Sequence, residues 1–163
     1  MKRSLVLIGA IIVFCSFQSR RSDFSGTWKL DLRQSVNLPE SFKGVEAYSM
    51  DVRQTSDSVI VVISLSGGGQ NVKFPQTVYA FETYREDTLR GSKRWIKCIW
   101  ETTGKKMVVT NNVRQKKDQA EVEYTQKDVW QLNDLNTVQI SMTQSFATGD
   151  STHSERRIFH RVK

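Results

Sequence analysis

Few residues of this sequence have the types and spacing that metal binding or catalysis requires. His153 and His160 are the only histidines, seven positions apart in one expected strand. Side chains alternate between the two faces of a strand, so these histidines should point to opposite faces and could not share a metal ion. Cys98 shares its face with the apolar residues Ile96 and Trp100, which favours a buried, unreactive thiol. We therefore expect no metal site and no cofactor.

Two further patterns only superficially suggest function. The three glycines at 67–69 lack the Lys-Ser/Thr pair and the helix of a phosphate-binding loop, and they favour a flexible hairpin. Glu121 and Glu123 share a strand face with lysine and threonine positions, which is typical of a solvated outer face rather than an acid–base pair. Aromatic residues are not interleaved with basic ones as in single-stranded nucleic-acid grooves. We expect no nucleic-acid partner and no enzymatic activity.

The start of the chain predicts export. Two basic residues precede the uncharged, mostly apolar run 5–17, which is shorter than the about 20 residues that cross a bilayer. This order is the pattern of a secretory signal peptide. We predict a signal peptide at 1–19 and a mature protein in the periplasm or cell envelope, or secreted; the alternatives are an uncleaved membrane anchor and a buried first helix. Phe14 is too large to precede a lipidated cysteine, which disfavours lipoprotein anchoring through Cys15.

Cysteine content and charge narrow the class of the mature protein. Cys98 is the single thiol outside the predicted signal peptide, so neither an intrachain disulfide nor a paired-cysteine zinc or redox site is expected. Packing and sheet hydrogen bonds must therefore hold the fold. The formal net charge of +7 comes from short, scattered basic clusters. This favours a solvated surface; the alternative is peripheral association with anionic lipid or polysaccharide of the cell envelope.

The elements that would position any site have a period of two. Runs such as TWKLDLR, RWIKCIW and TVQISMTQSF alternate, and turn signals such as TSDS and TTGKK separate them. Such a meander buries its strands in a sandwich or a barrel. We predict an all-β fold: a single antiparallel up-and-down β-barrel of about eight to ten strands over residues 20–163, because a barrel leaves no exposed edge. Pro39, in the irregular segment 34–47, predicts a short helix or lid after the first strand.

Both ends of the expected barrel resemble a known family. FSGTWKLD, residues 24–31, resembles the Gly-x-Trp signature of the calycin superfamily, which includes lipocalins, fatty-acid-binding proteins and avidins. RRIFHR, residues 156–161, resembles the last strand of fatty-acid-binding proteins. The whole layout is similar to small exported bacterial lipocalin-like proteins.

The resemblance implies roles for the residues at the two chain ends. Gly26 would allow a close backbone approach at the closed end of the barrel, and Trp28 would plug that end. A basic side chain from the last strand would lie across the indole; Arg157 is the first candidate and Arg161 the second. In fatty-acid-binding proteins a terminal arginine and tyrosine bind a carboxylate. Phe159 replaces that tyrosine and lacks its hydroxyl, so a structural role for Arg157 is favoured.

These observations predict a binding protein. A small barrel can hold one small ligand, and we expect an exported, lipocalin-like, non-catalytic protein that binds a small apolar or amphipathic molecule. The alternative is a cell-envelope interaction or scaffold protein whose barrel is filled by its own side chains. An interior where two polar, pKa-shifted groups converge would instead indicate an enzyme. The expected ligand-binding residues are Val62, Tyr79, Phe81, Trp100, Tyr124, Met142 and Arg157.

Overall fold

The computed structural model describes residues 21–89, 91–114, 121–149 and 151–162. The predicted signal peptide and Cys15 lie outside these residues. The described chain is built almost wholly of β-strands, as the alternating sequence predicts. Its strands are β1 (Gly26–Val36), β2 (Ala47–Gln54), β3 (Ser58–Gly67), β4 (Gln70–Lys73), β5 (Thr77–Ala80), β6 (Tyr84–Leu89), β7 (Ser92–Trp100), β8 (Lys106–Arg114), β9 (Val122–Asp134), β10 (Thr137–Phe146) and β11 (Thr152–Arg161).

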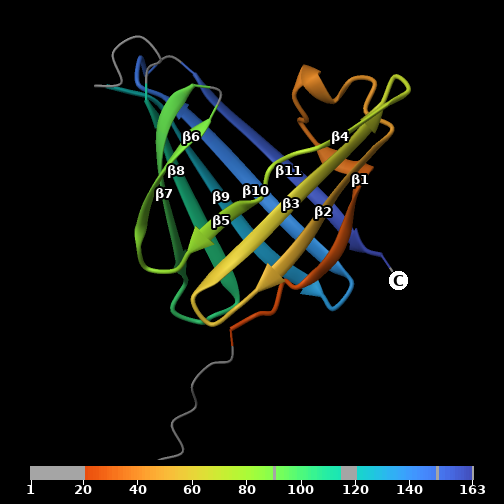
Figure 1. Cartoon of the computed structure of the whole chain (residues 1–163), viewed down its shortest axis with the longest axis horizontal. Helices are drawn as coiled ribbons and strands as arrows, with labels where there is room; N and C mark the ends of the chain where they lie inside the picture. The colour runs from red at the N-terminus through yellow and green to blue at the C-terminus, as the bar shows by residue number, and fades with distance from the viewer. Residues whose placement is uncertain (1–20, 90, 115–120, 150, 163) are drawn as a thin grey trace, which may run out of the picture.

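The strands form one antiparallel, 11-stranded sheet that curls around a central core (Figure 1). Its order is β4-β3-β2-β1-β11-β10-β9-β8-β7-β6, and β5 pairs with β3 beside β4. Nearly every strand therefore pairs with its neighbours in the chain, which confirms the predicted meander. There are two exceptions: β5 pairs with β3 rather than with β4 or β6, and β1 also pairs with β11 and so joins the two ends of the described chain, with Trp28 opposite Arg161.

The predicted complete closure of the barrel is wrong. No continuous ladder in the described residues joins β5 to the β6–β7 end of the sheet. One bridge spans this gap, between Phe81 and Cys98, and the Glu82 N–H donates to the Cys98 carbonyl at 2.8 Å. Pro75 interrupts the strand beside β3, because it cannot donate to a ladder. It falls between β4 and β5 and divides the neighbour of β3 into two short strands of four residues each.

The short helix or lid predicted after the first strand is not seen. The described segment between β1 and β2 contains a single turn of 3-10 helix, η1 (Glu40–Phe42). Asn37 and Gly44 flank this turn with positive φ values of 57° and 85°, which end any right-handed helix on either side. Phe42 nevertheless packs against the core. None of the described segments is a helix with the length and apolarity needed to cross a bilayer.

One half of the interior is filled by aromatic side chains. Phe24, which precedes β1, is fully buried. Its ring stacks on Trp100 with centroids 5.8 Å apart and meets Trp130 edge-on at 5.7 Å. Trp28 is also fully buried. We call this half, where β1 begins and β11 ends, the closed end; it leaves the opposite half, near η1, as the place for a site.

Candidate functional site

Gly26, Trp28 and Arg161 form one structural unit at the closed end. The Arg161 guanidinium lies 4.3 Å from the centre of the Trp28 indole. Its Nη1 and Nε donate to the carbonyls of Ser25 and Leu135 at 2.8 and 3.0 Å. The Trp28 Nε1–H donates to the Phe24 carbonyl at 2.8 Å. Arg161 therefore fastens the last strand to the first, as a cation–π contact with two additional hydrogen bonds.

The first candidate for this contact, Arg157, is the wrong residue. Both arginines lie on the same face of β11, but the register places Arg161 opposite Trp28 and Arg157 opposite Ile140. Arg157 therefore lies further along β11 from the closed end, and its guanidinium is 5.1 Å from the centre of the Phe42 ring. It is available to the other half of the interior.

Gly26 is a position where a methyl group should disturb the contact between the two ends of the described chain. A Cβ there would lie 2.5 Å from Arg161 Nη1, and its φ is +137°. We expect Gly26→Ala to lower the free energy of unfolding by about 2–3 kcal/mol, because steric conflict adds to backbone strain. Gly149→Ala is the control: its φ is +77° with nothing within 4 Å of the added Cβ. Equal losses in chemical denaturation would show that the close approach of Arg161 is unimportant.

A pocket opens beside η1 at the end of the interior opposite Trp28. We call it the mouth pocket; its volume is about 270 Å³. Apolar side chains form most of its wall, and Arg157 and the amphipathic side chain of Tyr48 also line it. The Phe42 ring stacks on Tyr48 with centroids 5.7 Å apart. The lining residues are Ser41, Phe42, Val45, Tyr48, Ile63, Leu65, Phe74 and Arg157.

On β8 to β11 the strands present polar side chains to the interior, in two rows that lie further from the closed end than Arg157. The ladder register aligns Glu155, Met142 and Asp128 across β11, β10 and β9. It aligns the row beyond them through His153, Gln144 and Gln126 to Asn111 of β8. We call the following set the interior polar cluster: Asn111, Gln126, Asp128, His153, Glu155 and Arg157.

Glu155 organises one side of the interior polar cluster. Its side chain is fully buried and forms an ion pair with Arg157 Nη2. His153 Nε2 lies 3.6 Å from the other carboxylate oxygen. A buried carboxylate is stable only with such partners. Arg157 is therefore held in an internal ion pair, and its charge is largely balanced before any ligand arrives.

Asp128 lies in a different electrostatic environment. Its carboxylate accepts two hydrogen bonds from the Gln126 amide, at 3.0 and 3.1 Å. Desolvation by burial raises the pKa of Asp128 from 3.8 to about 6, although the Gln126 hydrogen bonds and the charge of Arg157 oppose this shift. Asp128 is surrounded by protein but keeps some accessible surface, so its side chain borders space inside the sheet. It is a carboxyl with an incomplete set of partners.

Two buried tyrosines lie close enough to Asp128 for its charge to act on them. Burial raises the pKa of Tyr48, and Asp128 and Glu155 add to the effect while Arg157 opposes it. Burial also raises the pKa of Tyr79, again with a contribution from Asp128. Both phenols therefore stay neutral and can donate or accept hydrogen bonds.

Several buried polar atoms here have no hydrogen-bond partner. Among the described residues they include Asn111 Oδ1 and the indole Nε1 atoms of Trp100 and Trp130. Asn111 and Trp130 retain only 5% and 4% of their exposure. An unpaired buried polar atom costs about 1–3 kcal/mol, so native proteins normally pair it with protein, water or a ligand. Trp100 and Trp130 belong to the aromatic packing of the closed end, so Asn111 is the member of the polar rows with unused hydrogen-bonding capacity.

The expected ligand-binding residues divide into three groups. Met142 faces the inside in the same row as Asp128 and Glu155, and Arg157 lines the mouth pocket. The prediction for Val62 is wrong, because Val62 pairs with the exposed Asp51 in β2 and points outward. The remaining inward aromatics pack against other rings. Tyr79 meets Trp130, Phe81 meets Trp100, and Tyr124 meets Phe146.

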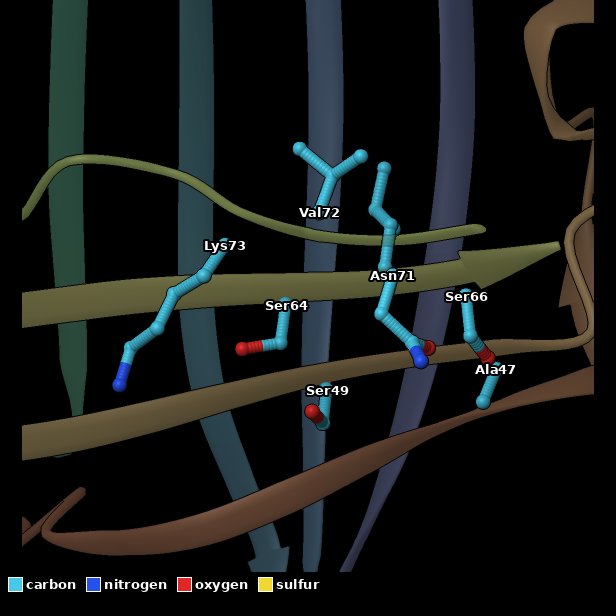
Figure 2. Close-up of a pocket in the computed structure, with 8 residues that line it drawn as sticks. Ala47, Ser49, Ser64, Ser66, Asn71, Val72 and Lys73 are labelled. Carbon is cyan, nitrogen blue, oxygen red and sulfur yellow. The ribbon is translucent and has the colours of Figure 1, made fainter. Parts of the chain in front are cut away.

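A groove on the outer face of β2, β3 and β4 is another candidate. Figure 2 shows the small side chains of Ser49, Ser64 and Ser66 along it, with Asn71 and Lys73 at its border. Its volume is about 330 Å³. The serines are partly exposed, and Asn71 and Lys73 are exposed, so water can satisfy these polar groups. We therefore place the candidate site inside the sheet, where polar atoms lack partners.

Comparison with known proteins agrees on the fold. The chain is similar to a point mutant of the fluorescent protein UnaG, with a TM-score of 0.57 and 16% identity over 86% of this chain and 96% of that one. It is also similar to a secretory abundant heat soluble protein from Ramazzottius varieornatus, with a TM-score of 0.56 and 10% identity over 85% and 95% of the two chains. No protein-family model and no curated protein matches the sequence. At such low identity the likeness establishes the fold, which is calycin-like.

Proposed function

We propose that this calycin-fold chain is an exported, non-catalytic protein that binds a small amphipathic molecule in the mouth-side half of its interior. The apolar part of the ligand would lie in the mouth pocket, and its polar part would reach the interior polar cluster. Export is inferred from the basic and apolar start of the sequence. The observation that carries the proposal is the buried, unpartnered side-chain oxygen of Asn111 in the interior polar cluster.

The distribution of side chains supports one binding region rather than a fully hollow interior. Phe24, Trp28 and Trp130 fill the closed end. The mouth pocket is lined mainly by aliphatic and aromatic side chains, and Arg157 and Tyr48 connect it to the polar rows. Apolar walls with a few convergent polar groups are the usual composition of a small-molecule site.

Polar groups with shifted pKa values do converge here, which is the feature that would indicate an enzyme. Burial raises the pKa of Asp128, Tyr48 and Tyr79 alike. Acid–base catalysis instead uses pairs whose environments push their pKa values apart, so that one group gives a proton and the other takes it. Three groups biased toward their neutral forms support hydrogen bonding to a ligand and favour binding over catalysis.

A scaffold role in the cell envelope is the second candidate, because the closed end is filled by the chain's own aromatic residues. The two functions differ in whether the mouth pocket accepts a guest. The neutral, apolar fluorescent dye Nile red tests this without assuming a head group.

We expect Nile red to bind the wild-type protein and Ile63→Trp to weaken binding at least about tenfold, since Ile63 lines the mouth pocket and the larger ring would occupy it. Val62→Trp is the matched control, one position along β3 on the outer face, and should bind as the wild type does. Dye fluorescence titration measures both. Equal weakening by the two variants would place the dye elsewhere, and no binding to any of the three proteins would favour the scaffold role.

A further inference from the structure

We propose that the interior polar cluster recognises a protonated amine, held by the Asp128 carboxylate and Asn111 Oδ1, so that the ligand is an amphipathic amine. This inference rests on the proposed function and names its ligand class. It is the opposite of the carboxylate that a terminal arginine in the last strand implies by family resemblance. Three features of the described residues support the amine assignment: Asp128 lacks a counter-ion, Asn111 offers a second hydrogen-bond acceptor near it, and Arg157 leaves room for the apolar tail of the ligand.

The charge balance of the interior leaves Asp128 uncompensated. Arg157 is paired with Glu155, and Arg94 Nη2 lies 2.9 Å from Asp87 Oδ2. Within the described part of the chain Asp128 has no ion-pair partner, and it is bound instead by the neutral Gln126 amide. A deeply placed carboxylate without a counter-ion is costly, and a cationic ligand would remove that cost. An anionic ligand would increase it.

The acceptors lie within reach of one head group. Asp128 is opposite Val109 in β8, and Asn111 is two positions further along that strand. Such diagonal neighbours lie about 7–8 Å apart and project from the same face. The Asn111 side-chain oxygen is buried and accepts no hydrogen bond from the described residues. An ammonium group has three donors and no acceptor, which matches a pair of acceptors.

Arg157 does not oppose this assignment. It lines the mouth pocket and its charge acts on Asp128, but Glu155 balances that charge and the Phe42 ring covers its guanidinium at 5.1 Å. The apolar tail of an amine held at Asp128 would extend past Arg157 into the wall formed by Val45, Ile63 and Leu65. Because its charge is already balanced, Arg157 would limit the space available to the ligand's tail rather than attract an anion.

The test compares three probes that share a ten-carbon chain and differ only in the head group: decylamine, decanoic acid and decanol. Each displaces Nile red at pH 7.5, where the amine is protonated and the acid ionised. We expect decylamine to bind at least about tenfold more tightly than decanoate, as a charge-assisted hydrogen bond predicts. Asp128→Asn should weaken decylamine about tenfold and leave decanol unchanged. Glu123→Gln, on the exposed face of the same strand, should change neither.

Each other outcome overturns a defined part of the proposal. Decanoate binding most tightly, or equal binding of all three probes, would overturn the amine assignment while leaving the proposed binding function intact. Tight decylamine binding that Asp128→Asn does not weaken would overturn the role of Asp128. No displacement by any probe, together with no Nile red binding, would overturn the proposed function itself.

Discussion

Replacing Trp28 by alanine should lower the free energy of unfolding by about 3–5 kcal/mol, the usual loss for a large aromatic removed from a core. The side chain is fully buried. Its loss leaves a cavity at the closed end, frees the Phe24 carbonyl from its 2.8 Å hydrogen bond and removes the ring beneath the Arg161 guanidinium. Domains of this size are stable by only about 5–15 kcal/mol, so the loss would be a large share of the total.

Chemical denaturation measures this effect, with Trp95→Ala as the matched control. Trp95 lies in β7, keeps 40% of its exposure and donates a hydrogen bond to Glu86 on the outer face. Its replacement should cost less than about 1 kcal/mol. Similar losses for the two tryptophans would contradict the assignment of Trp28 as the residue that closes the barrel end.

Replacing Asp128 by asparagine should raise the free energy of unfolding at pH 7, by about 1–2 kcal/mol, since each pKa unit corresponds to about 1.4 kcal/mol. Burial raises the pKa of Asp128 from 3.8 to about 6. The expected gain is below the full value because the carboxyl keeps some accessible surface. Asparagine has nearly the same shape and no charge. The wild-type residue would then be one that costs stability and is kept for binding.

The effect of Asp128 should depend on pH with a defined sign. The folded protein holds the Asp128 proton up to about pH 6, while the unfolded chain loses it near the ordinary value of 3.8. Between these values the folded state binds more protons, so the contribution of Asp128 to stability falls as the pH rises from about 4 to about 6. The groups that act on it are Arg94 and Arg157, which lower its pKa, and Glu155, which raises it.

The measurement is the difference in unfolding free energy between Asp128→Asn and the wild type across this range. It should be near zero at about pH 4 and reach its full value above about pH 6. Asp57→Asn is the control of opposite sign: hydrogen bonds from Thr55 and Ser58 lower the pKa of Asp57, so this variant should lose stability relative to the wild type as the pH rises. A gain for Asp128→Asn that stays constant with pH would contradict the raised pKa.

The strands and their buried faces can be predicted wherever apolar and polar residues alternate. RWIKCIW places Ile96 and Cys98 on one face, and both are buried there. The prediction for Val62 is wrong because β3 is apolar on both faces over several residues. The alternation of side chains then does not tell which face of the strand points into the interior. The incomplete closure could not be predicted either: short turns set the order of the strands, but they do not determine whether β5 forms a continuous ladder with the β6–β7 end of the sheet.

The choice between Arg157 and Arg161 needs the register of two strands far apart in sequence. Their positions are both odd, so alternation puts them on one face, and only the pairing of Trp28 with Arg161 decides between them. The interior polar cluster has a signal in the sequence that the prediction missed. Gln126 and Asp128 share the parity of Tyr124 and Trp130, which alternation places inward. Charged or amide residues at inward positions of a predicted strand indicate a site, since burial there requires a partner.

The central claim is that the interior holds a small molecule, and native mass spectrometry of the exported protein purified from its own host tests it most directly. We expect a reproducible adduct that solvent extraction removes, whose mass fits an amphipathic amine. The bare protein mass, together with no thermal stabilisation by decylamine, decanol or decanoic acid, would contradict this claim and leave the filled scaffold as the function to test next.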